Sequence, residues 1–209
     1  VVVQDTSDIV YLGMDIHRGD NSDIEISMGD YEKKILEAHQ TDGRAITPGQ
    51  SNLFDVKKDS VPLSSEESKE FHTACAKLLY LSKRTRPDIL IATSVLAGRV
   101  IEPTEDDNEK LSRVYKYLKK FPCGKLKFKG GKKFELQVYA DAAYMCHTDM
   151  TSRTGMVILA NGGVIATNSS KQKFVTKSST EAELVSLCDA GSMALYLRQF
   201  LELQGMKVP

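Results

Sequence analysis

The second half of the chain carries the pattern that most restricts its fold, a run of short alternating segments that ends in one long helical stretch. The alternating segments are FELQVYADA, GMVILANGG and VIATNSS, joined by glycine-containing turns. Alternation of apolar and polar residues with a period of two is typical of strands with one buried face. The stretch STEAELVSLCDAGSMALYLRQFLELQG then predicts a single helix. This order predicts a three-stranded antiparallel meander that leads into a long helix, and KLKFK predicts a further short strand before the meander.

The first half predicts a β-hairpin followed by helices. The segment IVYLGMDIHRGDNSDIEISM holds two alternating apolar runs around a Gly/Asp/Asn/Ser turn, which is a hairpin signal. Helices are expected over residues 30–40, from the cap-like LSSEES to a break at Pro87, from Asp88 onward, and over residues 105–121. Residues 41–63 are punctuated by glycine and proline and predict an extended connection. The fold class predicted for the whole chain is therefore α+β.

Composition limits the class of protein. The 209 residues are 41% hydrophobic and 27% charged, which predicts a globular chain without wholesale disorder. The longest apolar runs fall short of the ~20 residues that a membrane span needs, and no secretory signal precedes the first segment, so we expect a cytoplasmic or nuclear location. Four widely spaced cysteines form no CxxC pair, which predicts free thiols at Cys75, Cys123, Cys146 and Cys188.

A net charge of zero conceals a strongly basic segment. Ten Lys or Arg residues and no acid lie between Lys110 and Lys133, directly after two acidic stretches. Such a local field attracts polyanions, and phosphate backbones are its usual partners. The alternative is a solvated lysine-rich helix and hairpin without a ligand. The candidate nucleic-acid-binding residues are Lys110, Arg113, Lys116, Lys119, Lys120, Lys125, Lys127, Lys171 and Lys173.

Two carboxylates occupy positions that suit a metal ion. Asp141 ends an otherwise apolar alternating segment, and Glu183 lies in the first turns of the predicted long helix. Ser178 and Glu181 have the spacing of a capping box, which gives Glu181 a structural role and leaves Glu183 without one. Carboxylate oxygens suit Mg²⁺, which needs few of them when substrate phosphates complete its shell. The sequence therefore predicts a magnesium site at Asp141 and Glu183. The alternatives are a turn-forming aspartate and an exposed helix acid.

Three other polar residues near these acids have ordinary explanations. Asp189 is six residues beyond Glu183 and therefore on a different face of the helix, where it is expected at the surface. Asp149 lies in the hairpin turn HTDMTSRTG, where bonding to the local backbone is the better interpretation. His147 is expected to be a hairpin side chain and not a ligand.

The segments YADAAY, SRTGMVILANGGVIATNSSKQKFVTKSSTEAELVSL and ALYLRQFLELQG, in that order, resemble the ribonuclease H domain of copia-type LTR retrotransposon polyproteins. The first half is similar to the preceding part of their reverse transcriptase. There YLGMDI resembles the end of the palm, YEKKIL the start of the thumb, and LLYLSKRTRPDILIATSVL with VYKYLKKF the helices that lead into ribonuclease H. The resemblance covers nearly the whole chain. It implies a palm-end and thumb/connection segment over residues 1–121 and a partial ribonuclease H-like domain over residues 122–209.

The resemblance also implies a function. Members of the family copy RNA and cleave the RNA strand of RNA–DNA hybrids with two Mg²⁺ ions. By this resemblance Asp141, in YAD, would be a catalytic residue that bridges the metals, and Glu183, in EAEL, would hold one of them. The family's next active-site aspartate lies in a strand after the long helix, where this chain reads GMKVP, and the paired aspartates of the polymerase would precede Val1. Both catalytic sets are then incomplete, so we expect the chain alone to be inactive. The alternative is a decayed or domesticated remnant that binds nucleic acid or protein without catalysis.

The resemblance further implies an open sheet edge. In the ribonuclease H fold the first strand lies inside the sheet, so Glu135–Asp141 is expected to lack a partner on one side. Unpaired N–H and C=O groups beside apolar Leu136, Val138, Leu184, Leu187 and Leu195 favour pairing with another chain. The expected partners are therefore an RNA–DNA hybrid or duplex, and a second copy or a missing part of the polyprotein at this edge. No membrane is expected.

Overall fold

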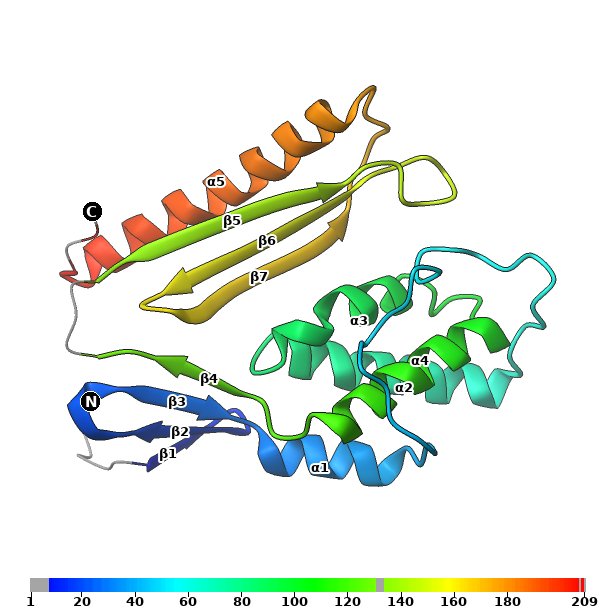
Figure 1. Cartoon of the computed structure of the whole chain (residues 1–209), viewed down its shortest axis with the longest axis horizontal. Coiled ribbons are helices and arrows are strands. Elements are labelled where there is room, and N and C mark those ends of the chain that lie inside the picture. The colour runs from blue at the N-terminus through cyan, green and yellow to red at the C-terminus, as the bar shows by residue number, and fades with distance from the viewer. Residues whose placement is uncertain (1–7, 131–133, 207, 209) are drawn as a thin grey trace.

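A computed structural model describes residues 8–130, 134–206 and 208 of the chain. The elements follow the order β1 (Asp8–Tyr11), β2 (Met14–Arg18), η1 (Asp20–Ser22), β3 (Ile24–Ser27), α1 (Gly29–Ala38), α2 (Ser65–Ser82), η2 (Pro87–Ile89), α3 (Leu90–Ala97), α4 (Glu105–Lys120), β4 (Lys125–Phe128), β5 (Leu136–Ala143), β6 (Arg153–Ala160), β7 (Gly163–Lys171) and α5 (Ser179–Leu203). Figure 1 shows a helical layer beside a small sheet, and a second sheet with α5 along one face. The described residues therefore form the predicted α+β fold with two antiparallel sheets.

The first sheet has the strand order β1–β2–β3–β4, and all its pairs are antiparallel. The sequence predicts one hairpin here, but the structure has a second tight turn at Leu12 and Gly13, whose φ angles are 50° and 73°. Two successive positive φ angles are the geometry of a type I′ turn, which Asn-Gly normally marks. Because Leu12 occupies the position where asparagine is usual, the sequence carries no such turn signal here. Its carbonyl accepts a hydrogen bond from the hydroxyl of Tyr80 at 2.7 Å, which ties the turn to α2.

Strand β4 pairs with β3 in this first sheet. The sequence analysis instead groups it with the strands of the meander, which follow it along the chain. Glu25 of β3 forms ion pairs with Lys125 and Lys127 of β4, at 3.0 and 2.6 Å, and apolar residues of the two strands alternate with these charges. Opposite charges on facing strands stabilise an antiparallel pair. The pairing joins residues on both sides of the boundary predicted at 121/122, and that division of the chain stays a prediction.

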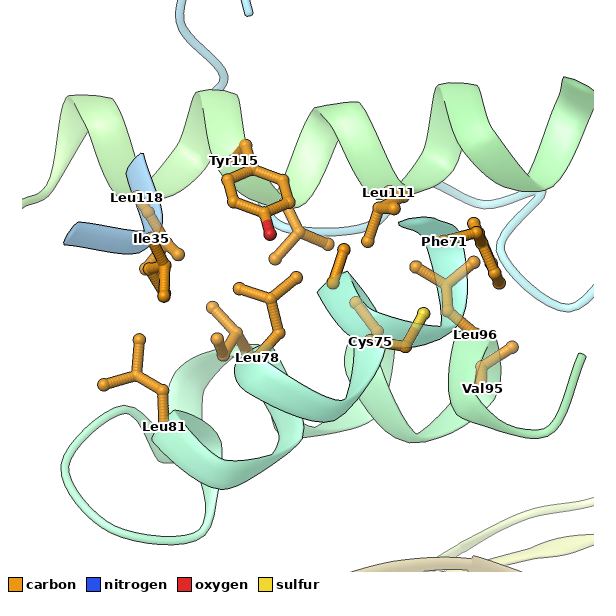
Figure 2. Close-up of a cluster of buried hydrophobic side chains, with 14 of the residues drawn as sticks. Ile35, Phe71, Cys75, Leu78, Leu81, Val95, Leu96, Leu111, Tyr115 and Leu118 are labelled. Atoms are coloured by element: carbon orange, nitrogen blue, oxygen red, sulfur yellow. The ribbon is translucent and has the colours of Figure 1, made fainter. Parts of the chain in front are cut away.

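The larger hydrophobic core lies among the helices (Figure 2). Figure 2 shows α4 facing α2, with side chains from α1 and α3 completing the cluster. Fully buried members are Leu78, Leu81, Leu96, Leu111, Val114 and Leu118. Both long helices begin with capping boxes, Ser64 with Glu67 at α2 and Thr104 with Asp107 at α4, in which the two residues satisfy each other's free N–H groups. The predicted break at Pro87 is confirmed, because a short 3₁₀ turn separates α2 from α3 there.

A buried arginine between α2 and α3 connects three parts of the helical layer. The Arg86 guanidinium donates to Glu32 of α1 at 2.8 Å and to both carboxylate oxygens of Asp88, at 2.8 to 3.2 Å. The hydroxyl of Tyr117, on α4, donates to Asp88 at 2.9 Å. Each of the Arg86 and Glu32 side chains is only 3% exposed, so the two charges are removed from water together. A pair of this kind is tolerated because each charge neutralises the other.

Arg86 also fixes the path of the chain from α4 to β4. Its Nη1 donates to the carbonyl of Phe121, where α4 ends, at 2.8 Å. The carboxylate of Glu32 accepts from the backbone N–H of Cys123 at 3.0 Å. A Cβ at Gly124 would lie 2.4 Å from the Arg86 side chain, so glycine is required at this close approach. The start of β4 is therefore set by the same buried ion pair.

The second sheet is the predicted meander, with strand order β5–β6–β7, and α5 covers one of its faces (Figure 1). Met156 and Ile158 of β6 pack in a small core with Ala190 of α5. The buried residues of α5 in the described chain are small and recur at four-residue intervals: Ala182, Ser186 and Ala190. Residues four apart share one face of a helix, so this stripe lets α5 approach the sheet closely.

Three of the contacts that join the second sheet to the rest of the described chain involve the side chains of Phe128, Lys83 and Arg153. The ring of Phe128, on β4, lies against Gly163 at the start of β7, where a Cβ would meet the ring at 2.3 Å. The ammonium of Lys83 donates to the carbonyl of Thr167, on β7, at 2.9 Å. The third contact is a hydrogen bond of 2.6 Å from Arg153, on β6, to Ser94 of α3.

Replacing Arg86 with methionine tests the buried ion pair. We expect Arg86→Met to lower the free energy of unfolding by about 3–5 kcal/mol, because it leaves the carboxylate of Glu32 buried without a cation. Adding Glu32→Gln should recover part of this loss, since the uncompensated charge is then gone. Urea unfolding followed by circular dichroism measures both variants. Arg198→Met, which breaks an exposed pair with Glu202, is the control and should change stability by less than about 1 kcal/mol. A loss in Arg86→Met no larger than the control's would contradict the role given to this pair.

Candidate carboxylate site and nucleic-acid interface

A serine on the buried stripe of α5 anchors the helix to the strand that carries Asp141. The hydroxyl of Ser186, which is completely buried, contacts the carbonyls of Asp141 at 2.6 Å and Gly155 at 3.1 Å. Asp141 and Gly155 face each other in the β5–β6 register. The second turn of α5 therefore lies against the end of β5 at the position of Asp141. Glu183 is three residues before Ser186, one turn nearer the start of the helix.

The start of α5 confirms one half of the predicted capping box. The Ser178 side chain accepts from the backbone N–H of Glu181 at 3.2 Å. The Glu181 carboxylate, however, accepts from the N–H of Lys177 at 2.6 Å and not from that of Ser178. The Glu181 carboxylate thus bonds the N–H of the residue before the N-cap, where a capping box would use the N–H of the N-cap itself. Glu181 is thus engaged by the backbone, as expected, and Glu183 is not.

Asp141 and Glu183 are both exposed, and neither side-chain carboxylate makes a hydrogen bond or ion pair with another described residue. Across residues 8–130, 134–206 and 208, no group of three or more His, Cys, Asp or Glu side chains is placed to hold a metal ion. Asp141 and Glu183 themselves offer two carboxylates. Hard oxygen ligands of this number fit Mg²⁺, which commonly keeps several waters and takes one or two carboxylates. Their assignment as metal ligands stays a prediction.

The neighbouring polar residues lie where the sequence predicts. Asp149 accepts from the hydroxyl of Thr151 at 2.7 Å and forms an ion pair with Lys171 at 2.6 Å, so it bonds within its own hairpin. The hydrogen bond from Lys171 is the main cause that lowers the pKa of Asp149. Asp189 is exposed on α5. His147 belongs to the same hairpin, and its ring lies near Arg153.

The basic residues of α4 lie on the helix face that the connection between α1 and α2 follows. Lys119 donates to the carbonyl of Thr41, and Arg113 donates to the hydroxyl of Thr47 at 2.9 Å. Lys110 turns inward, is 8% exposed, and pairs with Asp106 at 2.7 Å. Buried Lys110 therefore differs from its neighbours, because its charge is matched by an acid one turn away.

The remaining candidate cations fall into a paired and an unpaired group. Hydrogen bonds from Lys127 and then from Lys125 lower the pKa of Glu25 to about 2, so this acid stays ionised and neutralises part of the β4 charge. In the described chain Lys116, Lys120 and Lys173 have no acidic partner. The structure thus spreads the candidate cations over α4, β4, the end of β7 and the connection before α5. Binding of nucleic acid by these residues stays a prediction.

Strand β5 is an edge strand in the described part of the chain, since it pairs with β6 alone. Apolar side chains lie exposed near it: Val138 is 40% exposed on the strand, and Leu184, Leu187 and Leu195 of α5 are 57–60% exposed. The predicted combination of an open edge and exposed apolar residues is present among these residues.

The sequence analysis does not identify two buried residues at this end of the second sheet, Ser186 and Arg153. Ser186 looks like an ordinary helix serine, and the only available signal is its place in the four-residue spacing of Ala182 and Ala190. Arg153 lies in the predicted hairpin turn HTDMTSRTG and is 6% exposed. No pattern in the sequence indicates that α3 packs over it.

Replacing Ser186 with alanine tests the anchor between α5 and β5. We expect Ser186→Ala to lower the free energy of unfolding by about 1–2 kcal/mol, because a buried hydrogen bond to the strand backbone is lost. Ser192→Ala is the matched control, since Ser192 bonds only within the exposed face of the same helix and should change stability by less than about 0.5 kcal/mol. Urea unfolding measures both. Equal stability of the two variants would mean that Ser186 does not hold the helix in place.

Comparison with known proteins identifies relatives over most of the chain. A Ty5-1 transposon protein of Saccharomyces cerevisiae is 29% identical over 180 residues, covering 84% of this chain and 58% of the relative. The retrovirus-related Pol polyprotein from transposon TNT 1-94 of Nicotiana tabacum is 28% identical over 203 residues, 93% of this chain and 15% of the polyprotein. The secreted RxLR effector protein 161 of Plasmopara viticola is 32% identical over 126 residues, 60% of this chain and 89% of the effector.

No protein-family model matches the chain, and no solved structure matches it significantly. In the described part of the chain, no helix combines the length and the apolar character that crossing a membrane requires. The chain spans little more than half of the yeast relative and a small part of the tobacco polyprotein. The similarity to transposon proteins nevertheless extends over 84–93% of the chain. The chain is a homologue of the Ty/copia-type retrotransposon Pol polyproteins, at 26–31% identity.

Proposed function

We propose that the chain is part of a retroelement reverse transcriptase and ribonuclease H that holds an RNA–DNA hybrid. Together with the rest of the polyprotein it would copy RNA and cleave the RNA strand of the hybrid. The observation that carries the proposal is the Ser186 anchor, which brings the helix turn of Glu183 against the strand end of Asp141 in a chain of this family. The cytoplasm or the nucleus, where RNA templates and their DNA copies occur, is the location that goes with this function.

Asp141 and Glu183 would hold Mg²⁺ in this proposal. When bound, Mg²⁺ would polarise a phosphate oxygen of the RNA strand and help to generate the attacking hydroxide. The protein's own part would be to keep two exposed carboxylates at fixed backbone positions, through the Ser186 bond and the β5–β6 register. Exposure matters because the scissile phosphate must reach the same ion.

Binding of the hybrid would rest on cations that lack an acidic partner in the described chain. Lys116, Lys119 and Lys120 lie near the C-terminal end of α4, and Lys173 is exposed before α5. Each phosphate that such a residue neutralises releases counterions, which drives binding without reading the base sequence. Paired Lys110, Lys125 and Lys127 would contribute less, since acids already compensate them.

A second candidate function is a non-catalytic module that binds nucleic acid or protein. It is favoured by the similarity to RxLR effector protein 161, of which the chain covers 89%. The described residues also provide two carboxylates and no larger metal-binding group. In this case Asp141 and Glu183 would be ordinary surface acids, and Asp141→Asn would leave every nucleic-acid property unchanged.

The salt dependence of hybrid binding tests the basic face of α4. For each phosphate contact that is lost, the slope of log K against log salt should become less negative by roughly 0.9, the value for B-form DNA. We therefore expect Lys116, Lys119 and Lys120 changed together to Gln to flatten the slope and to weaken binding regardless of sequence. Fluorescence anisotropy with a labelled hybrid at several salt concentrations measures the slope.

The control for this experiment removes the same charge elsewhere. Lys57, Lys58 and Lys69 are exposed and lie outside the basic segment, so their joint change to Gln should leave the slope close to that of the unchanged chain. Identical slopes for the two triple variants would support a solvated lysine face without a ligand.

Cleavage by the purified chain tests the carboxylate pair. We expect weak Mg²⁺ binding and little or no hybrid cleavage, because two carboxylates fix a two-metal site less well than a larger set does. Gel analysis of a labelled hybrid with Mg²⁺ is the measurement. Robust cleavage that disappears in Asp141→Asn would contradict this expectation and would mean that the pair suffices.

The open edge of β5 would be covered by another polypeptide. We propose strand pairing at Leu136–Asp141, with apolar contact at Leu184 and Leu187, and a second copy is the partner available to the purified chain. An exposed edge beside exposed leucines is a combination that folded proteins seldom leave uncovered.

Sedimentation of the purified chain at micromolar concentration tests this pairing, and we expect self-association. Val138→Lys, which places a charge at the edge, should shift the chain towards the monomer, because edge lysines disfavour strand addition. Val56→Lys, at an exposed valine of the connection before α2, is the control and should leave association unchanged. A compact monomer whose amides over residues 136–141 exchange slowly would contradict the proposal, since the chain itself would then protect that edge.

A further inference from the structure

Arg153, at the start of β6, is a buried arginine whose partners are all neutral. The residue is 6% exposed. Its Nε donates to the hydroxyl of Ser169 at 2.8 Å, and its Nη2 donates to the hydroxyl of Ser94 at 2.6 Å and the carbonyl of Ser169 at 3.1 Å. Its Nη1 lies 3.4 Å from Nε2 of His147. Burial, followed by the charges of Arg153 and Lys171, lowers the pKa of His147, so the ring is neutral at pH 7.

Two other arginines with little exposed side chain, Arg86 and Arg99, have acids beside them. Arg86 pairs with Glu32 and Asp88, and Arg99 pairs with Asp107 at 2.5 Å. A buried cation without an acid is costly, because it has lost its hydration and gained no opposite charge. Arg153 is in that state within the described chain. A guanidinium carries five N–H groups, and the four contacts above leave one N–H of Nη1 without a protein partner among the described residues.

Arg153 lies in the wall of a cleft of about 290 Å³ between α3 and the β6–β7 hairpin. The polar residues of the wall include three serines, Ser94, Ser169 and Ser170, with Thr148 and His147, and its cations are Arg99, Arg153 and Lys171. At ~30 Å³ of liquid volume per water, a space of this size has room for a tetrahedral oxyanion and several waters. The hydroxyls and the guanidinium are donors that a phosphate oxygen can accept from.

The charges around the cleft leave one positive charge uncompensated. Lys171 is matched by Asp149 at 2.6 Å, and Arg99 is matched by Asp107. The charge of Arg153 remains. A site with one excess buried cation and several hydroxyl donors suits a small anion, and a planar guanidinium fork matches the oxygens of phosphate.

We propose that this Arg153 cleft binds a phosphate group. Arg153 faces Ala143 in the β5–β6 register, two residues beyond Asp141, so the cleft opens close to the strand end that carries the candidate metal ligand. The phosphate can come from the backbone of a nucleic-acid strand or from a free phosphate compound. The chemistry of recognition is the same for both sources.

Titration calorimetry with inorganic phosphate, against chloride at the same ionic strength, tests the cleft in the 209-residue chain. We expect Arg153→Gln to weaken phosphate binding by about tenfold or more, because a hydrogen bond from a charged donor is lost. Arg153→Lys should retain part of the affinity, since it keeps the charge and loses the fork. Arg198→Gln, on the exposed face of α5, should bind phosphate as the unchanged chain does.

Two further measurements keep the test decisive. Lys171→Gln changes an exposed residue of the cleft wall and leaves the buried arginine in place, so its folding does not depend on replacing that arginine. We expect this variant to bind phosphate several-fold more weakly. Thermal unfolding without phosphate should show Arg153→Gln to be no less stable than the unchanged chain, because an uncompensated buried charge is removed. A purely structural arginine would instead give a less stable variant whose phosphate affinity is unaltered.

An RNA–DNA hybrid distinguishes the two sources of phosphate. If the backbone is the ligand, inorganic phosphate competes with the hybrid and Arg153→Gln weakens both. If a free phosphate compound is the ligand, Arg153→Gln weakens the binding of inorganic phosphate and leaves the affinity for the hybrid unchanged. Both outcomes support the cleft, and the phosphate titration does not depend on hybrid binding. The proposal is overturned if phosphate does not bind the unchanged chain, or if Arg153→Gln and Lys171→Gln bind it with unchanged affinity.

Discussion

The buried charge of Arg86 is the constraint on which the helical half of the molecule depends. A guanidinium does not lose its proton in a protein, so its burial requires acids at fixed places around it. Glu32 and Asp88 provide them, and Glu32 can do so only if α1 lies beside the α2–α3 junction. The same side chain accepts from the N–H of Cys123, which places the start of β4 and therefore its pairing with β3. One buried ion pair thus fixes the relative positions of α1, the end of α4 and the start of β4, although α1 is far from the other two in sequence.

The sheet half depends on a different kind of interaction. Small residues on α5 allow a close approach, and the hydroxyl of Ser186 then fixes the height of the helix along β5. No buried ion pair is involved among the described residues of this contact, and the carboxylates of interest stay in water. This arrangement suits a site that must exchange a metal ion and a substrate phosphate, because neither carboxylate is committed to a protein cation. Arg153 has the opposite character, since it is buried, charged and short of one partner.

Local patterns in the sequence account for most of the elements, and they fail where long-range contacts decide. The meander, the long helix, the capping residues Ser64 and Ser178 and the break at Pro87 follow from periodicity and turn chemistry. The place of β4 does not, because alternation in KLKFK predicts a strand but cannot name its neighbour. The turn at Leu12 is also missed, since a leucine at positive φ carries no turn signal and is held by a tertiary bond from Tyr80.

The candidate site shows the same division. Asp141 and Glu183 can be selected from the sequence because one ends a strand and the other lacks a capping role. The bond that relates them, from Ser186, joins residues 45 positions apart and has no sequence signature. The basic segment is visible as composition, but the inward turn of Lys110 depends on Asp106 and on the carbonyl of Asp55. Charge counted along the chain therefore overstates the charge available to a ligand.

The central claim is that Asp141 and Glu183 act together as ligands of one divalent ion. Titration of the isotopically labelled chain with Mn²⁺, followed by nuclear magnetic resonance, tests it directly, because Mn²⁺ accepts the same oxygen ligands as Mg²⁺ and broadens the signals of nearby amides. The account predicts that amide signals around residues 141 and 183 broaden together at the lowest Mn²⁺ concentrations, and that Asp141→Asn or Glu183→Gln removes both effects. Broadening confined to one of the two residues, or strongest at the acidic start of α4, would contradict it.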